Sequence, residues 1–306
     1  MSTEELDRPP SLRSLYPRAI LHRGGGRGEL SGHRLRLTDQ PIDPDRLWRY
    51  QQLCGFRVSD LLPATYPHLL AFPLSMALMT RPDFPFPLLG LIHIGNQISQ
   101  QRPIRGTERV TVRAWATGLC PHPAGQSVDL VSEALVGDEL VWREVSSYLH
   151  RERSADRKPG SDRKPDPDRN QHRDPAASNA GPVIRWSAPA DIGRRYSTVS
   201  GDRNPIHLTG LSAKVFGFRA AIAHGMWLKA RTLAAFEGRL PDRFRVEVAF
   251  KTPVFLPSTV ELQAEPAAPG WQFEVRGVRS GKPHLAGTIS AHPTTDSGTG
   301  QALTAS

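Results

Sequence analysis

The stretch Tyr196-Ser-Thr-Val-Ser-Gly-Asp-Arg-Asn-Pro-Ile-His207, followed by Ala221-Ile-Ala-His-Gly-Met226, anchors the interpretation of the whole chain. Within it, Asp202 and His207 stand five residues apart, with Asn204-Pro205 between them. The proline fixes its own φ and pushes the asparagine out of the helical region, so this segment cannot be a plain helix. Gly201 allows a sharp bend just before the acid. A turn of this kind can aim the carboxylate and the imidazole at one point.

The motif resembles the MaoC-like dehydratases, also called (R)-specific enoyl-CoA hydratases or hydratase 2. The residues that carry the resemblance are Tyr196, Ser200-Gly-Asp-Arg-Asn-Pro-Ile-His207, Ala213, Gly217-Phe218 and Ile222-Ala-His-Gly-Met226. It covers residues 190–291 well and the first half of the chain only weakly. The resemblance implies that Asp202 and His207 hold one reacting water between them. It also implies syn addition of that water to a trans-2-enoyl thioester, giving the (R)-3-hydroxyacyl product.

Hydration of an α,β-unsaturated thioester has three chemical requirements. A water must lose a proton near Cβ, a proton must reach Cα, and negative charge on the thioester oxygen must be stabilised. A carboxylate and an imidazole can meet the first two, the imidazole because its ordinary pKa is about 6.5. Burial would raise the pKa of Asp202 and nearby charges or hydrogen bonds would lower it, so the sequence leaves the direction open. The division of acid and base roles within the pair is open as well.

The third requirement points to Gly225. Residues 223–226 lie at the start of a helix predicted over 220–236, where free backbone N–H groups and the helix dipole favour negative charge. Glycine has no side chain to block a close approach. The resemblance implies that the N–H of Gly225 binds the thioester carbonyl, and a donor of this type can contribute about 3–4 kcal/mol in the transition state.

Four neighbouring residues are predicted to bind substrate or to orient the loop: Ser200, Asn204, His224 and Met226. Ser200 and Asn204 are expected to orient the loop instead of reacting, and His224 either packs, caps the helix or contacts substrate. No metal site is predicted, because the sequence spacing of Asp202, His207 and His224 fits no usual ligand set. No cofactor is expected beyond the coenzyme A that belongs to the substrate.

The order of predicted elements is the same in both halves of the chain. In the first half, an apolar helix over 69–79 precedes strands predicted at 91–99, 109–119, 127–135 and 140–151. In the second half, the helix over 220–236 precedes strands at 244–250, 258–264, 271–280 and 284–291. A helix followed by an antiparallel meander is an α+β pattern. Two such copies predict a double hot-dog, in which each long helix is wrapped by a curved antiparallel sheet.

These elements divide the chain into five segments. Residues 1–32, with Gly24-Gly25-Gly26, are predicted to be a flexible N-terminal segment. Residues 33–150 form an N-terminal hot-dog domain without the catalytic motif, and residues 182–292 form a MaoC-like C-terminal domain with it. The intervening residues 151–181 are rich in charge and proline and cannot bury enough apolar surface to fold, which predicts a disordered linker. Residues 293–306 are predicted to be a disordered tail.

The first half differs from the second in its chemistry. It contains no Gly-Asp-x-Asn-Pro-x-His motif, and neither His68 nor His93 has an acid five residues before it. Core or loop roles are therefore favoured for these two histidines. The resemblance implies that this half has lost the catalytic loop and makes room for the acyl chain. The chain would then be a fused form of a two-subunit dimer, either a monomer with this internal pseudo-dimer or a homodimer.

Composition narrows the function classes further. A chain of 306 residues is long enough for two domains, each with a core of its own. No run approaches the eighteen apolar residues of a membrane span, and two cysteines, Cys54 and Cys120, are too few for a disulfide framework. These features predict a cytoplasmic protein. The net charge of +9 comes without a basic helix or zinc-finger spacing, which argues against nucleic acid and suits the phosphates of coenzyme A.

Three functions fit the sequence. The first is reversible hydration of trans-2-enoyl-CoA to (R)-3-hydroxyacyl-CoA. The second keeps this chemistry but places the acyl group on an acyl-carrier protein or a polyketide intermediate. The third is a non-catalytic hot-dog protein that binds acyl-CoA. The intact acid–imidazole pair argues against the third, because a binding protein has no need of it.

Overall fold

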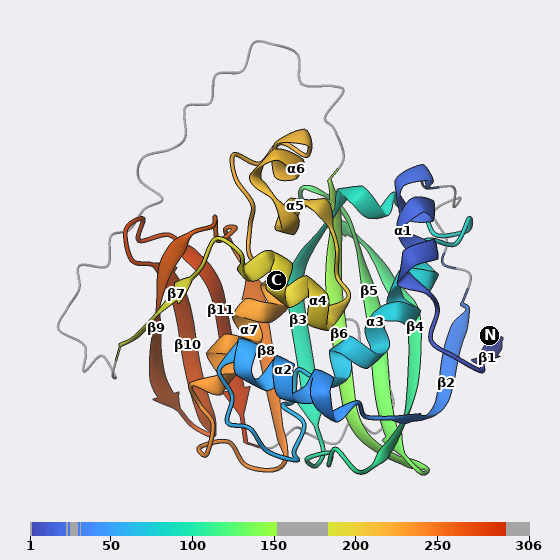
Figure 1. Ribbon diagram of the computed structural model, residues 1–306, viewed down its shortest axis with the longest axis horizontal. Coiled ribbons are helices and arrows are strands. Elements are labelled where there is room, and N and C mark those ends of the chain that lie inside the picture. The colour runs from blue at the N-terminus through green and yellow to red at the C-terminus, as the bar shows by residue number, and fades with distance from the viewer. Residues whose placement is uncertain (1, 23, 25–29, 31, 152–182, 292–306) are drawn as a thin grey trace.

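A computed structural model of the chain describes residues 2–22, 24, 30, 32–151 and 183–291. Its centre is one sheet of eleven strands, in the order β1-β2-β4-β5-β6-β3-β8-β11-β10-β9-β7. Every neighbouring pair is antiparallel except β1 and β2. The helices gather on one side of this curved sheet (Figure 1). The α+β class predicted from the sequence is confirmed.

The first half of the chain supplies one helix-on-sheet unit. Its elements are β2 (Arg34–Pro41), α2 (Pro44–Cys54), α3 (Pro67–Met79), the short 3-10 helix η1 (Leu88–Gly90), β3 (Leu91–Gln100), β4 (Arg109–His122), β5 (Gly125–Val136) and β6 (Glu139–Arg151). Helix α2 begins at Pro44 because the Asp43 side chain accepts hydrogen bonds from the backbone N–H groups of Asp45 and Arg46. Gly55 ends it in the left-handed conformation.

The second half repeats this order with one addition. Its elements are β7 (Ile184–Ala188), α4 (Ile192–Ser200), α5 (Pro205–Leu208), α6 (Gly210–Val215), α7 (Gly225–Ala234), β8 (Phe244–Phe250), β9 (Ser258–Ala267), β10 (Gly270–Gly277) and β11 (Pro283–Ser290). The strands lie close to their predicted positions. The helix predicted over 220–236 begins only at Gly225, since residues 221–223 instead bond to Ile206 and to the loop after β8. The added helices α5 and α6 follow the turn that holds Asp202, and α5 contains His207.

The two halves share one sheet and one core. Strand β3 of the first half pairs with β8 of the second, with Ile98 opposite Val246. Both side chains are fully buried. The main hydrophobic cluster includes residues of both central helices, Leu74 on α3 and Leu233 on α7. Burial of apolar surface therefore joins the halves into one body, at about 25 cal/mol per Å².

The N-terminal segment differs from its prediction. Residues 1–32 were expected to be flexible, but this part contains a strand, β1 (Thr3–Leu6), and a helix, α1 (Leu12–Leu21). Strand β1 pairs in parallel with β2. Leu15 of α1 belongs to a second hydrophobic cluster with Phe72 and Met76 of α3, and Ala19 of α1 is also buried. The apolar residues of α1 recur at helical spacing, which favours a helix. The prolines and glycines nearby in the sequence favour a flexible segment, and the prediction followed them. The predicted linker and tail lie outside the described residues, apart from Arg151, which ends β6.

Among the described residues, no helix combines the length and apolar character that crossing a membrane would need.

Candidate active site

The catalytic acid predicted from the sequence lies in a tight turn after α4. Gly201 ends this helix with φ of 82°, in the left-handed region that favours glycine. The backbone N–H of Asp202 donates to Ser200 Oγ at 3.1 Å, and the N–H of Asn204 donates to Asp202 Oδ1 at 3.0 Å. The Asp202 side chain remains 28% exposed, so a water can reach a carboxylate whose orientation is fixed.

His207 is positioned by the short helix α5. Asn204 caps this helix through its side chain, and Pro205 occupies the first helical position, where it leaves no donor unsatisfied. His207 Nδ1 lies 2.8 Å from the carbonyl oxygen of Ile222. A carbonyl can only accept, so Nδ1 carries the proton and donates it. Nε2 therefore keeps a lone pair that can accept a proton from water.

A second imidazole completes the cluster. The rings of His207 and His224 stack with centroids 3.7 Å apart and planes inclined by 27°. The Nε2–H group of His224 donates to the backbone carbonyl of Asp202 at 3.1 Å, and Nε2 lies 3.7 Å from the carboxylate. Asp202, His207 and His224 each offer one oxygen or ring nitrogen that could bind a ligand, and these three atoms lie within 4.8 Å of one another. The fold thus brings together the residues that the sequence singled out.

The charges of the pair follow from burial and from their neighbours. Burial alone would raise the pKa of Asp202, but the imidazoles of His224 and His207 and the N–H of Asn204 outweigh it and hold that pKa below its usual range. Burial lowers the pKa of His207, although the Asp202 carboxylate opposes this. Near neutral pH, an ionised carboxylate therefore lies beside a neutral imidazole. This is the state needed to take a proton from water.

The start of α7 provides backbone donors beside the pair. The helix begins at Gly225, and the carbonyl of His224 accepts its first hydrogen bond from the N–H of Leu228. The first N–H groups of a helix have no partner within it. A Cβ at Gly225 would lie 3.0–3.1 Å from ring atoms of Phe250, so glycine is also required for this ring to pack. Donation to a substrate carbonyl by Gly225 stays a prediction.

The corresponding position in the first half has no such donor. Helix α3 begins at Pro67, which lacks an N–H. Both histidines of interest lie in the interior of this half. His68 Nδ1 is 2.9 Å from the buried carboxylate of Glu144, and the His93 ring stacks on Tyr148 with centroids 4.6 Å apart. The asymmetry between the halves therefore extends from the missing motif to the helix start.

Comparisons with known proteins show which family the chain resembles. The model of the MaoC like domain family matches residues 163–285. The 3-hydroxyacyl-thioester dehydratase X (HtdX) of Mycobacterium tuberculosis is 40% identical over 264 residues, which cover 85% of this chain and 90% of that protein. The chain belongs to the MaoC-like dehydratase family.

Solved structures of this family share the fold. The crystal structure of HtdX matches with a TM-score of 0.71 and 37% identity, covering 84% of this chain and 98% of that chain. A MaoC-like dehydratase from Phytophthora capsici gives a TM-score of 0.68 at 16% identity, with 86% and 96% covered. A double hot-dog protein of M. tuberculosis gives 0.50 at 14% identity, with 89% and 96% covered. The predicted double hot-dog fold is confirmed.

The other residues predicted to bind substrate or to orient the loop of this MaoC-like dehydratase differ in what they contact. Ser200 Oγ donates to the Tyr196 carbonyl at 2.9 Å and accepts from the N–H of Asp202, so it braces the turn. Asn204 caps α5. Met226 is only 5% exposed and belongs to the main core, which places its side chain among apolar neighbours. No sequence pattern indicates a role for Tyr16, whose hydroxyl extends from α1 and donates to the Gly201 carbonyl in the turn before Asp202.

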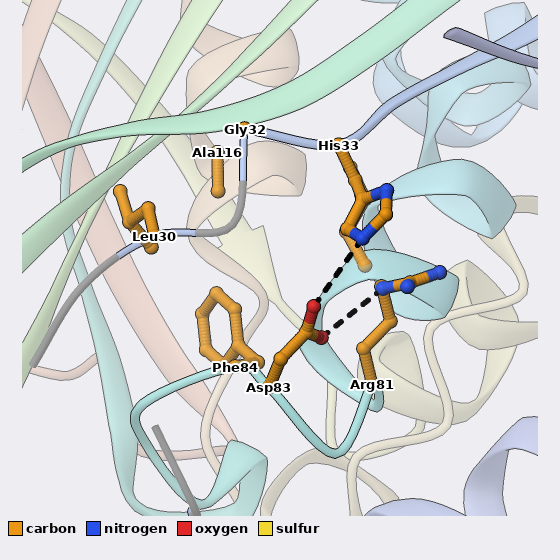
Figure 2. Close-up of a pocket in the computed structure, with 8 residues that line it drawn as sticks. Leu30, Gly32, His33, Arg81, Asp83, Phe84 and Ala116 are labelled. Carbon is orange, nitrogen blue, oxygen red and sulfur yellow. Dashed lines mark hydrogen bonds and ion pairs between the residues drawn. The ribbon is translucent and has the colours of Figure 1, made fainter. Parts of the chain in front are cut away.

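Two hollows lie outside this cluster. One, of about 10 Å³, is at the C-terminal end of α3, and Figure 2 shows His33 and Arg81 directed toward the Asp83 carboxylate beside it. It has room for about one water and cannot hold a thioester. The other is a surface groove of about 330 Å³ between α2 and α4, lined by Arg49, Arg194 and Arg195 among others.

The cluster also has the dimensions of a metal site. The sequence spacing of Asp202, His207 and His224 fits no usual metal-ligand set. In the folded chain, by contrast, their possible metal-ligand atoms lie within 4.8 Å of one another. However, Nε2 of His224 carries the proton that it donates to the Asp202 carbonyl, so this atom has no lone pair to offer a cation. In this tautomer only Nδ1 of His224 keeps a lone pair, and it has no hydrogen-bond partner among the described residues. The absence of a metal ion at this cluster stays a prediction.

Exhaustive chelation should leave turnover unchanged. A carboxylate and an imidazole can move both protons of a hydration without a Lewis acid. The measurement is the initial rate of thioester hydration before and after dialysis against EDTA, with total metal content recorded. Loss of activity on chelation and its return with Zn²⁺ would contradict this prediction.

The buried histidine should make stability depend on pH. Burial, together with the charge that His207 carries when it is protonated, lowers the pKa of His224 to about 3 from its ordinary value of 6.5. Between pH 3 and 6.5 the unfolded chain therefore binds more protons than the folded one, and the free energy of unfolding rises with pH. His224→Gln should flatten this slope, by at most about 1.4 kcal/mol per pH unit. Urea titrations at several pH values measure the slope of the free energy of unfolding against pH, with His122→Gln as the control. An unchanged slope in His224→Gln would show that His224 is not the source of the pH dependence.

Proposed function

We propose that this protein interconverts trans-2-enoyl thioesters and (R)-3-hydroxyacyl thioesters by adding or removing one water. The observation that carries the proposal is the convergence of the Asp202 carboxylate and the His207 imidazole within 4.8 Å, beside the start of α7. HtdX, named as a 3-hydroxyacyl-thioester dehydratase, supports the assignment at 40% identity.

The proton balance of hydration fits the residues. One proton leaves the water for the pair, the remaining hydroxide adds to Cβ, and one proton is delivered from the pair to Cα. The thioester oxygen carries negative charge in between, and the N–H of Gly225 donates to it. Dehydration is the reverse sequence. No electrons are gained or lost, so the proposed reaction uses no cofactor.

Coenzyme A is the first choice of carrier. The groove between α2 and α4 is lined by three exposed arginines, Arg49, Arg194 and Arg195, and no described residue forms an ion pair with their side chains. Positive charge of this density favours a substrate that bears several phosphates. An acyl-carrier protein is the alternative carrier. A non-catalytic acyl-CoA-binding role is the second alternative, and the ionised carboxylate beside a neutral imidazole argues against it.

The test is a series of enoyl thioesters of increasing chain length, each presented on coenzyme A and on an acyl-carrier protein. We expect loss of absorbance from the conjugated thioester, with the higher kcat/KM on coenzyme A. A higher kcat/KM with the acyl-carrier protein would identify the carrier-protein thioester, and not the coenzyme A thioester, as the preferred substrate. Binding without turnover across the whole series would support the non-catalytic role and contradict the proposal.

A further inference from the structure

The N-terminal helix α1 reaches the catalytic turn across 185 residues of sequence. The Tyr16 hydroxyl donates to the carbonyl oxygen of Gly201 at 2.9 Å and accepts a hydrogen bond from the backbone N–H of Arg203. It also lies 3.5 Å from Asp202 Oδ1. One hydroxyl thus contacts the peptide groups on both sides of the catalytic carboxylate. A tyrosine hydroxyl has one proton to donate and lone pairs to accept, so this arrangement uses both functions.

The turn itself has little other support. Residues 201–204 lie between α4 and α5 and belong to no helix or strand. Their other hydrogen bonds are local, within the turn or to Ser197, Ser200, Ile206 and His207. The exception is His224, which donates to the Asp202 carbonyl. Without the hydroxyl, the Gly201 carbonyl and the Arg203 N–H would lose the partner that ties them to the rest of the fold.

The helix that carries Tyr16, α1, is held in place by buried apolar contacts. Leu15 and Ala19 of α1 are 5% and 1% exposed, and Leu15 belongs to a cluster with Phe72 and Met76 of α3. Leu12 packs directly on Gly201, where any Cβ would clash with its side chain. Burial, together with the charge of Asp202, raises the pKa of Tyr16 well above its ordinary value, so the hydroxyl keeps its proton.

We propose that Tyr16 is a positioning residue for the reaction: its hydroxyl fixes the two peptide groups that flank Asp202 and so aims the carboxylate at the reacting water. This inference rests on the proposed function. It also gives the first half of the chain a part in the active site, because α1 is anchored on α3. Small displacements of a catalytic group are costly, about a hundredfold in rate for 1 Å.

The first test is Tyr16→Phe, which removes the hydroxyl and keeps the ring. We expect kcat to fall about tenfold to a hundredfold, with KM within about twofold of the wild-type value. Tyr66→Phe is the matched control, because the Tyr66 hydroxyl is buried and has no hydrogen-bond partner among the described residues. A kcat for Tyr16→Phe within twofold of the wild type would overturn the proposal.

A double-mutant cycle separates positioning from a general loss of structure. If Tyr16 acts through Asp202, adding Tyr16→Phe to Asp202→Asn should leave the residual rate unchanged, because the group to be positioned is already gone. A further tenfold drop in the double variant would show that Tyr16 acts elsewhere. This comparison holds even where Tyr16→Phe lowers the melting temperature.

A readout that needs no turnover distinguishes this proposal from the proposed function. Amide hydrogen exchange of a peptide covering residues 197–208 should become faster in Tyr16→Phe and stay unchanged in Tyr66→Phe. Unchanged exchange in both variants would overturn the positioning role. Wild-type protein that hydrates no enoyl thioester would overturn the proposed function alone, since the exchange result is obtained in either case.

Discussion

Asp202→Asn should lower kcat for thioester hydration at least a hundredfold while the chain still folds. The amide keeps an oxygen for the N–H of Asn204, which donates to Asp202 Oδ1 at 3.0 Å, so the turn can retain its shape. It cannot take a proton from water, which removes half of the acid–base pair. The rate is measured by the absorbance of the conjugated thioester, and folding by circular dichroism.

Two further variants complete this experiment: one at His207, the other member of the pair, and one at Asp191, an acid outside the site. His207→Ala should lower kcat by at least the same factor, because Nε2 is lost as well as the hydrogen bond to the Ile222 carbonyl. Asp191→Asn is the control, since the Asp191 side chain forms no capping hydrogen bond at the start of α4. Unchanged turnover in both site variants would remove the catalytic assignment.

Gly193→Ala should be nearly as damaging, although Gly193 contacts no reacting atom. This glycine lies in the first turn of α4, and a Cβ there would overlap the backbone carbonyl oxygen of His207. Either α4 or the α5 segment must move, which displaces one member of the catalytic pair relative to the other. We expect kcat to fall about a hundredfold and stability to fall by about 1–3 kcal/mol.

Gly210→Ala is the matched control for this substitution. Gly210 is also a first-turn helical glycine, in α6, and a Cβ there would meet nothing within 4 Å. Activity and the denaturation midpoint of Gly210→Ala should stay close to wild type. A Gly193→Ala variant with the same kcat as Gly210→Ala would show that the contact between α4 and His207 has no bearing on the site.

The proximity of Asp202 and His207 could be predicted because its signal is local. Asp202 and His207 are five residues apart, and the turn formers between them dictate that both lie on one short segment. The strands were predictable for a similar reason, since alternation and turn residues are short-range features. Their positions in the structure differ from the predictions by only a few residues.

The contacts that support the site were not predictable, because they join distant segments. Nothing near Tyr16 indicates that its hydroxyl meets a loop 185 residues away. The helix predicted from residue 220 also begins later than its apolar spacing indicates. Tertiary hydrogen bonds from Ile222 and Ala223, to the carbonyls of Ile206 and Val254, hold this segment extended. That conformation places Gly225 at the helix start.

The asymmetry of the two halves fits the proposal of a single active site in the part of the chain that the structure describes. The second half contributes the carboxylate, the imidazole and a helix that begins with Gly225. The first half begins its central helix with Pro67, which has no N–H to offer an oxyanion, and instead supports the catalytic turn through α1.

The configuration of the product tests the central claim most directly. Wild-type protein incubated with a trans-2-enoyl-CoA should give the (R)-3-hydroxyacyl thioester, resolved by chiral chromatography, and Asp202→Asn should give at most one hundredth of it in the same time. An (S) product, or the same yield of (R) product from Asp202→Asn, would contradict a hydration carried out by Asp202 and His207 on a single water.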